Sequence, residues 1–477
     1  MVHPALTAPR RRRVLGGLLD ADGWTWAGVK AAFWFVVIIL LLGYLPDRAY
    51  YFTVQRTVDI GLLAWAPVNF CPPENEGLPC PVPAGALLPW HLAPEELRLP
   101  AGRSDGVAGV IGQTYIYAGG SDGEQAPSAD VYISHAVGTG NLDTWSAGPA
   151  LPEARADAAS VVLGNSLYVI GGFGPDGTPT DTVYSLTVGN DGTLPDAWVE
   201  EEAVQLPEAR AGASAVTLSD GIVLMGGTNG TEVTNTVWKS KQVTGGGLGE
   251  WVPQSPLFEP NVDGVATHTG DVIFLIGGRN DADAVVATVQ QGHVGGANAP
   301  ADDPNAVVDQ WRVSAQTNLP GPRSDMSGFT ANGGIYVQGG NDGTTQSADT
   351  YWAIPDADGI IGGWKSLDPT DLGQGIEGSA AVVSGSHAFL IAGLTPQGVT
   401  NDIARTNLAP QEPFFQAGLL GVTVPALKLD GEVGQQIGYL NAAGVGTVNF
   451  ILLILIGYLY NHPAKAEAIW NRIRRRR

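Results

Sequence analysis

The chain of 477 residues is long enough for several domains or for one large repeat structure, and its 65 glycines and 33 prolines indicate many turns and few long helices. Its formal net charge of −22 is unevenly distributed, because residues 47–460 carry 14 basic and 44 acidic groups whereas both ends are basic. An acidic central region repels phosphate groups, so we expect no nucleic-acid partner.

Residues 24–46 form an apolar stretch long enough to cross a bilayer, and they follow a basic N-terminal segment, residues 1–23. A second such stretch, residues 433–460, carries no charged residue and precedes a basic tail, residues 461–477. Because positive residues flank the cytoplasmic ends of membrane helices, we predict a cell-membrane protein with both termini cytoplasmic and residues 47–432 outside. A cleavable signal peptide is the competing interpretation of the first stretch, and a buried core helix that of the second.

Residues 47–84 are predicted to form an extracytoplasmic connector, which contains the two cysteines of the chain, Cys71 and Cys80. They are close in the sequence, and an oxidising compartment favours a small disulfide loop between them. A reduced pair or half of a metal site is the alternative.

From residue 85 to residue 409, a short apolar run that ends on two glycines recurs six times, the last time degraded. The steps are 51 to 62 residues, with an insertion near residues 292–304 in the longest, and a tryptophan precedes each doublet by 26 to 29 residues. A period near fifty residues is typical of an array of repeated units. The doublets are Gly119–Gly120, Gly171–Gly172, Gly226–Gly227, Gly277–Gly278, Gly339–Gly340 and Ala392–Gly393, and the tryptophans are Trp90, Trp145, Trp198, Trp251, Trp311 and Trp364.

Each unit contains four short strands separated by turn residues, and these strands can bury their apolar faces only against neighbouring units. The strand closing on Gly–Gly, an aromatic third strand such as Val183–Tyr184, the late tryptophan and the Leu–Pro–x–x–Arg element at Leu206–Arg210 resemble the kelch repeat. The resemblance implies an all-β, six-bladed propeller, here flanked by two transmembrane helices. The last unit lacks a tryptophan strand, and Trp90 begins a strand without a preceding unit. We therefore predict that the N-terminal strand closes the last blade.

A second connector, residues 410–432, leads to the second apolar stretch. There, small residues recur on one helical face and allow another helix to approach closely. The partner would be the first span, a second copy of the chain or another membrane protein; the alternative is a set of small residues without a tight partner. The helix-packing candidates are Gly434, Gly438, Ala442, Gly446 and Asn449.

A repeated polar element opens the first strand of each unit. First strands are innermost in a propeller, and in the kelch propellers that this chain resembles, arginines at this position line the ligand pocket. We therefore predict an axial pocket that also holds Asp105, Asp157, Asp263 and Asp325. The alternative is that the arginines pair with these aspartates and with neighbouring backbone as struts between blades. The pocket candidates are Arg103, Arg155, Arg210, Arg323, Asn261 and Glu377.

We expect no metal and no cofactor. The seven histidines are scattered, and no pair has a metal-ligand spacing. Asp356–Gly359 and Asn280–Asp283 lack the spacing and the closing glutamate of a calcium loop. Galactose oxidase shares the propeller type, but its copper site requires a cysteine, and no cysteine lies within the blades of this chain.

Two function classes remain. The first is a membrane-anchored scaffold whose propeller binds a protein or glycan at the face directed away from the membrane. The second is a carbohydrate-active enzyme, because the resemblance extends to six-bladed kelch mutarotases that act on sialic acid. Arginines would then hold a carboxylate, and Glu377 or a histidine would donate a proton. The sequence places no convincing base beside the arginines, which favours binding.

Overall fold

The computed structural model of the protein describes Trp34 and residues 63–67, 71, 77–83, 85–137, 141–243, 246–295, 299–307, 311–356, 359–409, 411–417 and 422–425. The chain divides into two compact units, and the one formed by residues 57–431 contains all of these except Trp34. Apart from Trp34, the two predicted spans, with the small-residue stripe from Gly434 to Asn449, lie outside the described residues. Within the described part, no helix combines the length and the apolar character needed to cross a bilayer.

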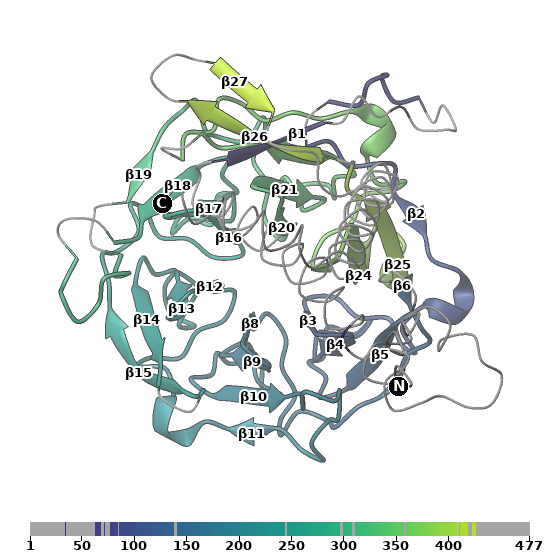
Figure 1. The fold of residues 1–477 in the computed structure, drawn as a ribbon. Helices are drawn as coiled ribbons and strands as arrows, with labels where there is room; N and C mark the ends of the chain where they lie inside the picture. Colours follow the sequence, from purple (N-terminus) through teal and green to yellow (C-terminus); the bar gives the residue numbers. More distant parts are fainter. Residues whose placement is uncertain are drawn as a thin grey trace, which may run out of the picture. The chain divides into compact units, whose positions relative to one another are not determined.

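Six antiparallel sheets surround a common centre in the unit of residues 57–431 (Figure 1). This arrangement is the six-bladed, all-β propeller that the repeats predict. The first blade consists of β3 (Val107–Ile111), β4 (Thr114–Ala118), β5 (Val131–Val137), β6 (Asn141–Leu142) and β7 (Ser146–Ala147). The second consists of β8 (Ala159–Leu163), β9 (Ser166–Ile170), β10 (Val183–Thr187) and β11 (Val199–Glu200). The third consists of β12 (Ser214–Leu218), β13 (Gly221–Met225), β14 (Val237–Gln242) and β15 (Leu248–Pro253).

The other three blades differ in how their outermost strand is supplied. In the fifth blade, the expected fourth strand is reduced to one bridge between Trp352 and Lys365. The strands are β16 (Val265–Thr269), β17 (Val272–Ile276), β18 (Val289–His293) and β19 (Arg312–Val313); β20 (Ser327–Ala331), β21 (Gly334–Gln338) and β22 (Thr350–Ala353); and β23 (Ala380–Ser384), β24 (His387–Thr395), β25 (Gly398–Asn407) and β2 (His91–Leu92). Short 3-10 helices follow the outer strands of three blades, at η3 (Glu95–Leu97), η4 (Glu202–Val204) and η5 (Asp368–Thr370).

The burial of the strands explains the apolar runs of the sequence. Second strands such as β9 and β17 are buried along their whole length, because a neighbouring blade covers each face. A strand covered on both faces reads as a continuous apolar run. First strands such as β3 and β8 alternate between buried and half-buried residues instead. The buried side chains form six clusters, one at each junction between blades.

The N-terminal strand closes the ring, as predicted. β2 pairs antiparallel with β25 and completes the sheet β2–β25–β24–β23. At the junction of the sixth blade with the first, Tyr115 packs edge-on against Phe389, with ring centroids 5.7 Å apart. Each innermost strand contacts those of both neighbouring blades. Every blade is therefore held by two others, and the ends of the array support each other.

A closed ring of backbone hydrogen bonds lies at the inner end of the blades. One residue of each blade, just before the first strand, donates its N–H to the carbonyl of the equivalent residue in the preceding blade, at 2.8–3.0 Å. All six have φ between 49° and 60°, the left-handed region that glycine and aspartate tolerate better than most residues. The ring consists of Asp105, Asp157, Gly212, Asp263, Asp325 and Gly378.

The glycine doublets make the second repeated link between blades. The second glycine of each doublet donates its N–H to the carbonyl at the arginine position of the next blade, as Gly172 does to Arg210 at 2.7 Å. A Cβ on Gly171 would lie 2.3 Å from the same carbonyl oxygen, and its φ of +64° already favours glycine. In the sixth blade, Ala392 occupies this position with φ 59°, and the register of β24 with β25 shifts at that point. The bulge accommodates a side chain where the other blades need glycine.

Parts of the two connectors lie within the described residues. Cys71 and Cys80 form the predicted disulfide. In addition, β1 (Leu63–Pro67) pairs with β26 (Gln411–Ala417), which pairs with β27 (Val422–Pro425), so the segments before and after the propeller share a three-stranded sheet.

The insertion before β19 reaches back to the third blade. Its Asp303 lies 2.6 Å from Nζ of Lys239, a residue of β14 whose side chain is fully buried. Asp220 lies 3.0 Å from the same ammonium group, so two carboxylates compensate one buried positive charge.

The close approach at the doublets predicts a difference between two glycines with the same backbone strain. Gly171→Ala should lower the free energy of unfolding by about 1–3 kcal/mol more than Gly177→Ala, because of these two sites only the Cβ at residue 171 would meet a backbone oxygen. Gly177 also has a positive φ (+75°), but no atom lies within 4 Å of the place that its Cβ would take. Urea unfolding of the two variants measures this difference. Equal losses would show that the neighbouring blade moves aside without cost.

Candidate functional site

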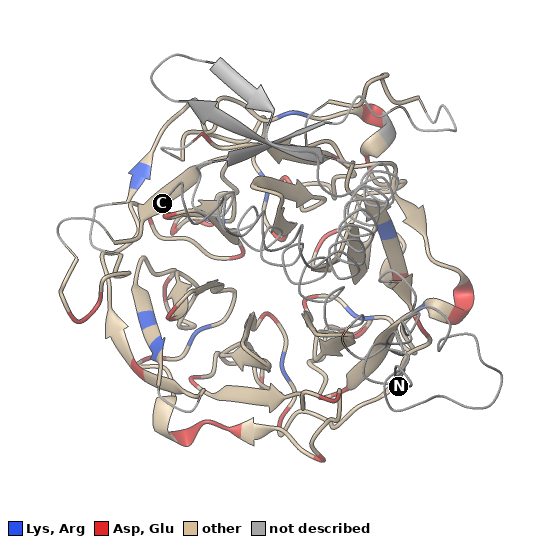
Figure 2. Ribbon diagram, in the orientation of Figure 1, with Lys and Arg blue, Asp and Glu red and all other residues tan. Residues whose placement is uncertain are grey.

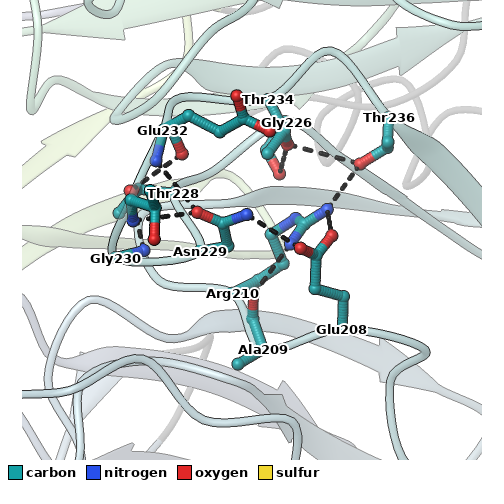
Figure 3. Close-up of polar contacts among 11 residues, drawn as sticks. Glu208, Ala209, Arg210, Gly226, Thr228, Asn229, Gly230, Glu232, Thr234 and Thr236 are labelled. Carbon is teal, nitrogen blue, oxygen red and sulfur yellow. Dashed lines mark hydrogen bonds and ion pairs between the residues drawn. The ribbon is translucent and has the colours of Figure 1, made fainter.

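The arginines that open the first strands do not point toward the axis. Arg210 is 1% exposed, and its guanidinium turns outward to the third strand of its blade (Figure 3). There Nη2 donates to Thr236 Oγ1 at 2.9 Å and to Glu208 Oε2 at 2.8 Å, and the guanidinium lies over the ring of Trp238, 4.6 Å from its centroid. Its own carbonyl is bonded to the preceding blade through Gly172. Arg210 therefore links two blades.

The other three arginines repeat this arrangement. Each donates to a hydroxyl or carboxylate at the start of the third strand, and Arg155 also donates to the hydroxyl of Tyr184 at 2.8 Å. The acceptors are Asp130 for Arg103, Thr182 for Arg155 and Asp349 for Arg323. Arg103, Arg155, Arg210 and Arg323 thus lie apart, one in each of four blades, and their guanidinium groups pair with carboxylates other than the axial aspartates.

The two remaining candidates occupy different places. Asn261 is buried, and its Nδ2 donates to the carbonyl of Gly277 at 2.7 Å. The slot that an arginine would fill in this blade holds Gln290 instead, whose amide exchanges hydrogen bonds of 3.0 and 3.1 Å with the backbone of Glu259. Glu377 is half-buried and accepts a hydrogen bond from Gln346 Nε2 at 3.0 Å.

The groups that do gather at the axis are carboxylates. Asp105, Asp157 and Asp325 each place a carboxylate oxygen within 4.8 Å of the others. Asp263 is paired with Arg279, which directly follows the glycine doublet of the same blade. Figure 2 shows acidic segments on the inner loops of several blades. These aspartates belong to the backbone ring described above, so the same left-handed residues that bond the blades together also direct carboxylates inward.

Burial and mutual repulsion perturb the acidity of these groups. Burial raises the pKa of Asp105 to about 6, and repulsion from Asp263 and Glu377 adds to the rise. A hydrogen bond from Ser104 Oγ at 2.7 Å lowers this pKa but does not cancel the effect of burial. Burial and the charge of Asp263 raise the pKa of Asp325 to about 8. The pKa of Asp157 is raised well above its ordinary value by burial and by the neighbouring aspartates. Near neutral pH the group therefore holds protons that isolated aspartates would release.

A pocket of about 640 Å³ opens beside two of these carboxylates, Asp105 and Asp157. Its walls come from the loops after the second strands, Ser121–Gln125 and Phe173–Gly177, and from the turn Gln397–Val399. None of the four arginines contributes to it. The pocket offers carboxylate acceptors and backbone polar groups, which suits hydroxyl, ammonium or guanidinium donors. Asp105, Asp157 and Asp325 are also the set of acidic groups, within the part of the chain that the structure describes, whose spacing would fit a cation.

The sequence predicts the axial aspartates at a pocket, but at one that the arginines also line. A signal for their separate role is present in the sequence: aspartate stands two residues after the arginine position in four units, and glycine stands there in the other two. Aspartate alternating with glycine indicates a left-handed backbone position.

The strut role of Arg210 predicts a stability defect. Arg210→Ala removes three charge-assisted hydrogen bonds, to Ala209, Glu208 and Thr236, and the contact with Trp238, so it should lower the unfolding free energy by about 2–4 kcal/mol in chemical denaturation. Arg312→Ala, at an exposed position of β19, is the matched control and should cost little. Arg210→Lys should recover only part of the loss, because an ammonium group cannot reproduce the planar stacking. Wild-type stability of Arg210→Ala would argue against the strut.

The raised pKa values predict that stability decreases as pH rises. Between about pH 4 and about pH 8, the folded protein retains protons at Asp105 and Asp325 that the unfolded chain releases, so the free energy of unfolding falls with rising pH. Asp325→Asn should flatten this dependence in thermal unfolding. Asp342→Asn, which removes an exposed carboxyl whose pKa is lowered to about 2, should leave it unchanged. An unaltered slope in Asp325→Asn would contradict the assignment.

Comparison with known proteins gives a kelch motif at residues 154–190. A kelch repeat protein, M-T8 of Myxoma virus, is 28% identical over 52% of this chain and 41% of its own length. The N-acetylneuraminate epimerase of Salmonella paratyphi B is 30% identical over 34% of this chain and 47% of its own length. The chain thus spans less than half the length of these curated relatives.

A solved structure, that of YjhT, shares the fold with a TM-score of 0.50 at 14% identity, covering 69% of this chain and 99% of that one. The kelch motif, the kelch-repeat relatives and the six-bladed fold support a place for this chain in the kelch-repeat family.

Proposed function

We propose that this chain is a membrane-anchored binding protein whose propeller recognises a protein or glycan partner at the acidic axial pocket. The proposal of membrane anchoring rests on the two apolar stretches of the sequence, residues 24–46 and 433–460, with their basic flanks. The proposal of binding rests on the propeller unit itself.

The observation that carries the binding proposal is the pairing of a pocket of about 640 Å³ with inward-facing carboxylates, while the arginines are engaged within the blades. Ligand pockets combine concave walls with a few convergent polar groups, and here those groups are acceptors. Glycan hydroxyls and the basic side chains of a protein partner supply the matching donors. An anionic ligand would be repelled by the charged form of Asp105 and Asp157.

A second candidate is a carbohydrate-active enzyme, on the evidence of the similar protein named N-acetylneuraminate epimerase. One feature favours it: carboxyl groups with pKa values of about 6 and about 8 are suited to donate and accept protons near neutral pH. The position of the arginines opposes it, because a neuraminate carries a carboxylate and the four arginines that would hold it are committed to the third strands. We therefore rank this candidate second.

The full-length chain in detergent, screened against neutral glycans, sialylated glycans and basic peptides, tests the proposal. We expect retention of a neutral glycan or a basic peptide, with binding weakened at least about tenfold in Asp157→Asn because the amide, unlike the carboxyl group, cannot ionise when a hydrogen-bond donor binds. Asp342→Asn, outside the pocket, is the control. Conversion between anomers of N-acetylneuraminate, followed by NMR and lost in Asp157→Asn, would instead establish the enzyme.

A further inference from the structure

The sixth blade contains a second pocket, of about 310 Å³, which is distinct from the axial one. It lies among the outer strands of the blade, β24, β25 and β2, and the segment that enters the blade from the fifth. Its walls include Leu372, Ile376, Leu390, Asp402, Ala404 and Trp90.

The repeat identifies what fills this position in the other blades. The carbonyl of Ile376 accepts the N–H of Gly340 at 2.8 Å, as the carbonyl of Arg210 accepts that of Gly172, so Ile376 stands at the arginine position. Ala404 pairs with Leu390, which lies three residues before Gly393, and Tyr184 pairs with Val169, which lies three residues before Gly172. Ala404 is therefore the equivalent of Tyr184.

The acceptor at the start of the third strand is retained. Asp402 immediately precedes Ile403, as Thr182 precedes Val183 and Asp130 precedes Val131. The sixth blade has therefore lost both the guanidinium and the aromatic ring beneath it, but has kept a carboxylate at the place where the guanidinium would be received.

The fourth blade shows that the loss of the arginine need not leave a pocket. There Asn261 replaces the arginine, and the amide of Gln290 fills the slot by bonding the backbone of Glu259. In the sixth blade the residue at the position of Gln290 is Ala404, which is too short for this role. The pocket is thus a vacant arginine slot.

Trp90 also departs from the repeat in this blade, although its indole N–H, a donor, would need an acceptor other than a guanidinium. The five other late tryptophans donate their indole N–H to the carbonyl six residues before the arginine position, for example Trp251 to Val204 at 2.8 Å. Within the described residues, the indole nitrogen of Trp90 is buried and has no hydrogen-bond partner. Asp402 has one ion-pair contact, from Nε of Arg98 at 3.0 Å, and Arg98 does not line the pocket.

We propose that this slot binds a guanidinium group supplied from outside the chain, carried by an arginine side chain of a partner or by a small molecule. Asp402 would receive the guanidinium as Asp130 receives that of Arg103 and Asp349 that of Arg323. Leu390 and the space left by Ala404 accommodate the apolar stem. A guanidinium fits better than an ammonium, because a planar, weakly hydrated cation is what the other blades place between apolar walls.

The test measures binding to the full-length chain by calorimetry, with three probes: an acetyl-Gly-Arg-Gly-amide peptide, its citrulline counterpart and agmatine. We expect the arginine peptide or agmatine to bind and the uncharged citrulline peptide to bind at least about tenfold more weakly. Stronger binding of the peptide would indicate a protein partner, and equal or stronger binding of agmatine a small guanidine.

Variants then locate the site. Ile376→Arg restores the arginine of the repeat and should abolish binding, and Ala404→Tyr, which fills the same slot from β25, should do so if the first variant fails to fold. Asp402→Asn should weaken binding at least about tenfold, whereas Asp130→Asn, the same change in a blade whose slot is filled, should not. Binding that survives both slot-filling variants, or that is lost only in Asp157→Asn at the axis, would overturn the proposal. A failure of both the arginine peptide and agmatine to bind would also overturn it.

Discussion

The ring of six backbone hydrogen bonds around the axis is the constraint on which the rest of the propeller depends. Each blade donates one N–H to the blade before it, and the circle is complete only because Asp105 donates to Gly378, joining the first blade to the last. The bonds require a left-handed backbone, which restricts the residue mainly to glycine, aspartate or asparagine. Where the chain uses aspartate, a carboxylate is delivered to the centre. The acidity of the axis is thus tied to the geometry that closes the ring, and the binding that we propose there would use groups that the fold has already positioned.

Because the repeat occurs six times, the same position can be compared in six blades. Four blades place an arginine between the preceding blade and their own third strand, one substitutes Gln290, and one leaves the position open beside Asp402. The departures from the repeat are more informative than the repeat itself. Ala392, which replaces the first glycine of a doublet, lies in the same blade and is accommodated by a bulge. The sixth blade, which is assembled from both ends of the propeller segment, is therefore also the blade whose sequence has diverged most.

The sequence predicted the blades, their number and the closing strand, because these depend on markers that recur. It also predicted the disulfide, because the chain contains only two cysteines. It did not predict the direction of the arginine side chains. Arg210 does lie just before a first strand, but its place in the chain does not determine whether a long side chain turns inward or along the blade. Its hydrogen-bond acceptor Thr236 and the ring of Trp238 lie 26 and 28 residues away in the sequence. The fourth strand of the fifth blade was expected from Trp364 and is reduced to a bridge at Lys365. The sheet of β1, β26 and β27 joins segments more than 340 residues apart, a pairing that local patterns cannot indicate.

That sheet has a mechanical consequence. Leu63 pairs with Phe415 and Pro67 with Gln411, so the chain enters and leaves the propeller unit through two strands bonded side by side. Tension applied between the two ends of the unit would act first on the pairs nearest those ends, Leu63 with Phe415 on the side of β1 and Pro425 with Phe414 on the side of β27, and would open the pairs one after another. The blades would carry no load until all of these pairs had separated. The sheet of β1, β26 and β27 would therefore separate before the ring does, and a force strong enough to part its strands would lengthen the chain on both sides of the propeller while leaving the blades folded.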